Sequence, residues 1–184
     1  FMSKLNGPRI SCCSTPRNTN PATIHLAHFH TVNVYKELTF LAQTIVEGLG
    51  IKNPMARAFR EAEFVGTVRG QLRSLAKGQL PTTTNSENPE LKPSVTQPDI
   101  WEVKYPKLWE ESRMQLRSYH GEPLGSGPDV VVVLFRSKQI DKLSDIEIAT
   151  RQNRDMRDAQ YRFDDGRPYR WGHTRRCRDC ISST

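Results

Sequence analysis

Two consecutive amphipathic segments within residues 31–78 limit most strongly how this chain can fold. In the first segment, apolar residues return at spacings of three and four, the period of a helix with one buried face; they are Val34, Leu38, Leu41 and Ile45. The second segment begins after Asn53-Pro54, a favourable helix start, and its stripe comprises Ala58, Ala62, Val65, Val68, Leu72 and Leu75. We therefore predict a helical hairpin over residues 31–78, with the two helices packed antiparallel.

Outside the hairpin, the chain offers few residues for a core. Hydrophobic residues make up 36% of the sequence, below the about 45–50% of an average globular protein. Residues 1–30 show no helical period and predict an extended basic arm. Residues 79–100 contain four prolines and predict a linker, or a segment that is ordered by a partner. Together these features indicate a mainly α fold, in which a hairpin and further helices are joined by long extended linkers.

Residues 101–163 predict a second helical segment. A short helix is expected from about Lys107 to Tyr119. The apolar run Val130–Phe135 suits either a buried strand or a helix, because periodicity alone does not separate the two. We expect a helix there, since no second strand signal is present to pair with the run. Ser144 and Glu147 have the spacing of a capping box, so a further helix should begin there and run to about Phe163.

The C-terminal tail, residues 164–184, combines arginines with aromatic side chains. No acid occurs between Arg167 and Arg178, and this stretch contains five arginines. Guanidinium groups bind phosphate oxygens and aromatic rings stack on bases. The net charge of +7 also favours an anionic partner, although an unstructured basic tail has the same composition. The resulting RNA-binding candidates are Arg167, Arg170, Trp171, Arg175, Arg176 and Arg178.

The same tail contains a candidate metal-binding motif. His173, Cys177 and Cys180 have a spacing at which a C-x-x-C turn and a histidine could bind a structural zinc ion. Cys12 or Cys13 could supply a fourth ligand. A single C-x-x-C is a weak signal and the nearby arginines suit plain RNA contact as well, so both interpretations stay open. No other cofactor is expected.

The sequence lacks the motifs of several enzyme classes. It has no glycine-rich phosphate loop followed by a lysine, no G-x-S-x-G and no H-E-x-x-H. We therefore expect a protein that is not an enzyme. The longest apolar run, Val130–Phe135, is far shorter than the about 20 residues of a membrane-spanning helix, so no membrane span is expected.

Four stretches of the sequence, taken in order, support a comparison with a known family. They are residues 67–81 (TVRGQLRSLAKGQLP), 98–101 (PDIW), 105–124 and 129–163. In this order they resemble the mitochondrion-specific small-subunit ribosomal protein twenty-three family. The resemblance implies a short helix and then an apolar helix in the last two stretches. It also implies a structural constituent of the mitochondrial ribosome, in the matrix, with ribosomal RNA and other ribosomal proteins as partners in a large hetero-assembly.

A second resemblance lies within the hairpin. Val34-Tyr35-Lys36, with Phe59-Arg60 downstream, is similar to the Leu-Tyr-Arg motif and later phenylalanine of the LYR family of small mitochondrial helical proteins. This resemblance implies instead an accessory subunit of a respiratory complex. The two alternatives differ in what would release the protein from its assembly: nuclease treatment for a ribonucleoprotein, detergent for a respiratory complex.

Overall fold

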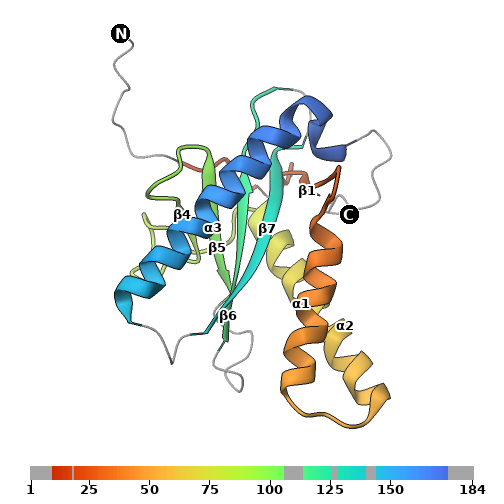
Figure 1. Cartoon of the computed structure of the whole chain (residues 1–184). Coiled ribbons are helices and arrows are strands. Elements are labelled where there is room, and N and C mark those ends of the chain that lie inside the picture. Colours follow the sequence, from red (N-terminus) through yellow and green to blue (C-terminus); the bar gives the residue numbers. More distant parts are fainter. Residues whose placement is uncertain (1–9, 18, 106–113, 126–127, 140–143, 174–184) are drawn as a thin grey trace.

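The computed structural model describes residues 10–17, 19–105, 114–125, 128–139 and 144–173. Within these ranges the chain has a mixed α/β fold, with three α-helices, a five-stranded mixed sheet and a small hairpin of two strands (Figure 1). The prediction of a mainly α fold is therefore wrong. Several segments that we expect to be an arm, a linker or helices form strands instead.

The two helices predicted over residues 31–78 are confirmed as α1, Val34–Gly48, and α2, Pro54–Ala76. Asn33 and Asn53 cap them, because each side-chain oxygen accepts hydrogen bonds from backbone N–H groups of the first turn. Among the helices that the structure describes, none is long and apolar enough to cross a membrane. The buried members of the two predicted apolar stripes are Val34, Leu38, Ile45, Val68, Leu72 and Leu75.

The sheet has the strand order β1-β7-β6-β5-β4. Its strands are β1 Ile24–Leu26, β4 Leu91–Pro93, β5 Ile100–Tyr105, β6 Met114–Gly121 and β7 Val130–Gln139. β1 runs parallel to β7, whereas the other neighbouring strands are antiparallel. The separate hairpin pairs β2, His28–Phe29, with β3, Val32–Asn33. The sheet thus places a strand from the start of the chain beside one from its second half.

β7 occupies a segment for which we predicted a helix. The residues from Val130 to Leu134 are fully buried, because helices α1 and α3 both pack against β7. A strand buried on both faces has a continuous apolar run without alternation, so periodicity did not identify it. The helix predicted from about Lys107 to Tyr119 is also wrong in its described part, where β6 begins at Met114. Residues 106–113 lie outside the described ranges.

The predicted arm and linker are parts of the fold. In the arm, β1 pairs with β7, and Ile24 and Leu26 are buried. In the linker, β4 pairs with β5, and Leu80, Leu91 and Ile100 are buried. Few apolar residues suffice in both segments, because neighbouring strands supply the backbone hydrogen bonds.

The third helix, α3, Asp145–Gly166, confirms the helix predicted from the capping box. It lies across the sheet (Figure 1) and packs on it through a narrow apolar stripe that includes Met156, Ala159 and Phe163. A Cβ atom at Gly121 of β6 would lie 2.2 Å from the Phe163 ring. Glycine at this position therefore allows the helix to approach the sheet closely.

Removal of the Ser144 hydroxyl should destabilise the protein modestly. Ser144 Oγ accepts a hydrogen bond from Glu147 N at 3.3 Å, and we expect Ser144→Ala to lower the free energy of unfolding by about 1 kcal/mol. Urea unfolding followed by circular dichroism measures this change. Ser144→Asp retains a capping oxygen and should cost less than about 0.5 kcal/mol. Equal losses in the two variants would contradict the capping role.

Candidate anion-binding site

A pocket opens between strands β6 and β7 and helix α3. Its volume is about 310 Å³, at the lower end of the range of about 300–1,000 Å³ for small-ligand sites. Five of its lining side chains are cationic and one is acidic, which suits the pocket to an anion. The cations are Arg117, Arg136, Lys138, Arg151 and Arg154, and the acid is Asp155.

The pleat of the sheet explains why these charges meet. Side chains alternate between the two faces of a strand, and directly paired residues share a face. The register pairs Arg117 of β6 with Lys104 of β5 on one side and with Arg136 of β7 on the other. Lys138 lies two residues beyond Arg136 and so shares its face. Helix α3 adds further arginines above this face.

A buried ion pair holds Arg117 in place. Arg117 Nη1 lies 2.9 Å from each carboxylate oxygen of Glu102, whose side chain is fully buried. Gln152 Nε2 donates to the same carboxylate at 2.7 Å, and Lys92 Nζ lies 3.5 Å from it. A buried carboxylate without such partners would be strongly unfavourable. These contacts therefore fix the guanidinium group against the sheet beside the pocket.

Acidic side chains neutralise only part of the remaining positive charge. Arg136 lies 3.4 Å from Asp155 and 3.8 Å from Asp158. The pKa of the Asp155 carboxyl is nevertheless raised, because burial outweighs the attraction of Arg136. Arg151 and Arg154 occupy exposed positions of α3, so both can bind a ligand without breaking a contact in the core.

Partial burial, assisted by neighbouring positive charge, lowers the pKa values of two lysines on this face of the sheet. The pKa of Lys104 is lowered, first by partial burial and then by the charge of Lys92. The pKa of Lys138 is lowered in the same way, first by partial burial and then by the charge of Arg117. A bound anion favours the charged form of nearby lysines. Of the two lysines, Lys138 lines the pocket, where an anion would favour its charged form.

Tyr119 adds a neutral hydrogen-bonding group to the lining of the pocket. Its side chain is fully buried, and its hydroxyl has no hydrogen-bond partner among the described residues. Burial, followed by the negative charge of Glu102, raises the pKa of this phenol, so the hydroxyl stays protonated. Because Tyr119 lines the pocket, a ligand oxygen there could accept its hydrogen bond.

Trp171, one of the predicted RNA contacts, lies in the core. Its side chain is only 6% exposed, and its ring stacks on Phe163 with centroids 5.0 Å apart. Its Nε1 donates a hydrogen bond to the backbone oxygen of Phe163 at 2.7 Å. Trp171 is the next-to-last residue of a 3₁₀ helix, η2, Arg167–Gly172, which follows α3 directly. Trp171 therefore packs within the protein and presents no open ring face to a base.

The remaining predicted tail residues lie apart from the pocket or outside the described ranges. Arg167 is exposed and lies 3.3 Å from Asp164, Arg170 is exposed, and the His173 ring lies 5.0 Å from that of His25. None of these three lines the pocket. The residues outside the described ranges are Arg175, Arg176, Arg178, Cys177 and Cys180; their RNA and metal contacts stay predictions.

Sequence reasoning missed the pocket because it missed the strands. The stretch Trp101–Tyr105 alternates apolar and charged residues, which is the pattern of a strand with one charged face. That signal places Glu102 and Lys104 on one face. It could have been recognised, whereas the placement of Arg117 beside Arg136 depends on a register that the sequence does not reveal.

Comparisons of this chain with protein-family models, with curated proteins and with solved structures found no match.

Proposed function

We propose that this protein binds RNA through the pocket between β6, β7 and α3, as a non-catalytic constituent of a ribonucleoprotein particle. The observation that carries this proposal is the excess of cationic side chains around a cavity of about 310 Å³. Among the lining residues, five cations surround one carboxylate, that of Asp155.

A phosphodiester group matches the chemistry of the pocket. Guanidinium groups donate forked hydrogen bonds to phosphate oxygens, and the pocket offers Arg151 and Arg154 at exposed positions for this purpose. The hydroxyl of Tyr119 supplies a neutral donor beside them. The cavity is too small for a duplex, so we propose that a single strand crosses its mouth and inserts one phosphate.

The charge of the whole chain favours a polyanion over an isolated phosphate. The net charge is +7, and further arginines occur outside the pocket, on α2 and α3 and in the tail. The resemblance to a mitochondrial ribosomal family implies the same class of partner, and the mitochondrial small subunit is the particle we propose. The strands β6 and β7 differ from the helices which that resemblance implied, so the proposal rests on the pocket.

Loss of two pocket arginines should weaken RNA binding. We expect Arg151→Ala/Arg154→Ala to lower the affinity for a short single-stranded RNA about tenfold at moderate salt, equivalent to about 1.4 kcal/mol. The slope of log K against log salt concentration should fall by about 1.4, since each lost contact with a single strand contributes about 0.7. Fluorescence anisotropy of a labelled oligonucleotide measures both quantities.

A matched control separates the pocket from general positive charge. Arg69 and Arg73 lie on α2 and do not line the pocket, so Arg69→Ala/Arg73→Ala removes the same charge elsewhere. We expect this variant to change the affinity by less than about twofold. If both double variants weaken binding equally, the protein binds RNA through diffuse charge and the pocket proposal is wrong.

A further inference from the structure

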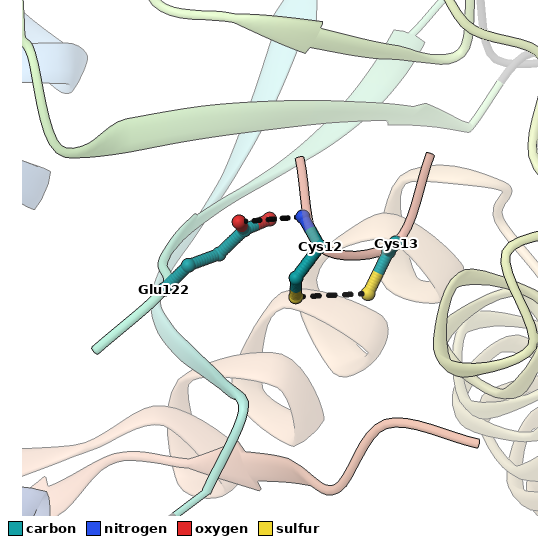
Figure 2. Close-up of side chains that lie close together, drawn as sticks. All are labelled: Cys12, Cys13 and Glu122. Carbon is teal, nitrogen blue, oxygen red and sulfur yellow. Dashed lines mark hydrogen bonds between the residues drawn. The ribbon is translucent and has the colours of Figure 1, made fainter. Parts of the chain in front are cut away.

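Two adjacent cysteines and a carboxylate lie close together in a cluster whose residues do not line the pocket. The sulfur atoms of Cys12 and Cys13 lie 3.6 Å apart, well beyond the about 2.05 Å of a disulfide bond. Glu122, just after β6, accepts a hydrogen bond from the backbone N of Cys12 at 2.8 Å and another from the Ser11 hydroxyl. Figure 2 shows the Glu122 side chain extending towards Cys12, with its carboxylate directed at the Cys12 backbone N. One ligand atom from each of these three residues lies within 4.8 Å of the other two.

The spacing of the two sulfur atoms matches a zinc site. Two thiolates bound to one zinc ion at about 2.3 Å, with tetrahedral angles, lie about 3.8 Å apart. The observed separation of 3.6 Å is close to this value. Thiolate and carboxylate groups are both common zinc ligands. Cys13 is fully buried and Cys12 and Glu122 are half-buried, so an ion would be bound within the protein.

A buried histidine, His120, lies next to the Glu122 carboxylate. His120 is fully buried, and neither of its ring nitrogens has a hydrogen-bond partner among the described residues. Its Nε2 lies 3.6 Å from Glu122 Oε1, slightly beyond hydrogen-bonding distance. Carboxylates that bind metals are usually held by a second group. A small movement of Glu122 would bring His120 into that role and satisfy one of its nitrogens.

We propose that Cys12, Cys13 and Glu122 bind a zinc ion, with His120 orienting the Glu122 carboxylate. The two thiols release their protons to solvent as the ion binds. Because Cys12 and Cys13 precede the sheet and Glu122 follows β6, the ion would join segments that lie 110 residues apart in sequence. This inference does not depend on RNA binding.

Zinc content tests the proposal. We expect the full chain, purified under reducing conditions and then dialysed in a zinc-containing buffer, to retain one zinc ion per molecule. Inductively coupled plasma mass spectrometry measures the zinc content. Cobalt in place of zinc should give the intense near-ultraviolet absorption of thiolate-to-metal charge transfer. Cys12→Ser/Cys13→Ser should lose both signals. Glu122→Gln, which can still accept a backbone hydrogen bond, should lower zinc affinity at least tenfold; it provides a second test if the double serine variant does not fold.

The tail cysteines provide the matched control. Cys177→Ser/Cys180→Ser removes the same number of thiols and should leave the bound zinc and the cobalt spectrum unchanged. If this variant loses the ion while Cys12→Ser/Cys13→Ser retains it, the tail motif is the metal site and the proposal is wrong. A wild-type chain that retains no zinc would contradict it equally. His120→Ala should weaken zinc binding about 10–100-fold without loss of the charge-transfer band, as expected for a residue that orients a metal ligand but does not bind the metal itself.

Discussion

Arg117→Met should lower the free energy of unfolding by about 3 kcal/mol. The substitution keeps an apolar chain of similar length but leaves the Glu102 carboxylate buried without the guanidinium that contacts both its oxygens at 2.9 Å. Breaking a buried ion pair from one side typically costs about 3–5 kcal/mol. The lower value is expected, because Gln152 and Lys92 still contact the carboxylate. Chemical denaturation of the two proteins measures the difference.

Two further variants show whether the loss of stability comes from the unpaired charge of Glu102. Glu102→Gln/Arg117→Met removes both charges and should be more stable than Arg117→Met alone, since neutral partners avoid the desolvation of a lone carboxylate. Arg73→Met, at an exposed position of α2, should change stability by less than about 0.5 kcal/mol. If Arg117→Met changes the free energy of unfolding as little as Arg73→Met does, the ion pair between Arg117 and Glu102 is not buried in solution and does not fix Arg117 beside the pocket.

This ion pair also shows where sequence reasoning reached its limit. Helix α3 could be predicted because its start depends on local chemistry, the capping box of Ser144 and Glu147. The helices α1 and α2 could be predicted because their apolar stripes repeat with the helical period. The contact between Glu102 and Arg117 depends on the pairing of β5 with β6. Pairing between strands is a non-local property, and one residue of slip would place these side chains on opposite faces.

The strands themselves were hidden for two different physical reasons. β7 is buried on both faces, so its valines form a continuous run that resembles the start of a helix. β1 and β4 have three residues each, too few for a period to be recognised, and their order comes from neighbouring strands. The alternation in β5 was the one visible signal. Recognising it would have supplied the partner strand whose absence favoured a helix at Val130–Phe135.

Trp171→Ala should be the most destabilising tail substitution in the described residues, with a loss of about 3–5 kcal/mol in the free energy of unfolding. The ring is 6% exposed, stacks on Phe163 and donates a hydrogen bond to the Phe163 backbone oxygen. Its removal leaves a cavity beside α3 and a carbonyl without its donor. Trp171→Phe keeps an aromatic ring but loses the N–H group, so its cost should be about 1–2 kcal/mol. Thermal and urea unfolding measure both variants.

The same substitution separates a core role for the tail from a role in RNA binding. A base-stacking tryptophan contributes about 1–3 kcal/mol to binding and little to folding. A core tryptophan affects stability and leaves the affinity of the folded protein within about twofold of the wild type. Tyr169, in the same 3₁₀ helix and 53% exposed, is the matched control, and Tyr169→Ala should cost less than about 1 kcal/mol. If Trp171→Ala weakens RNA binding without loss of stability, Trp171 is a surface contact. The tail would then be the RNA-binding element, as the arginine-rich sequence first indicated.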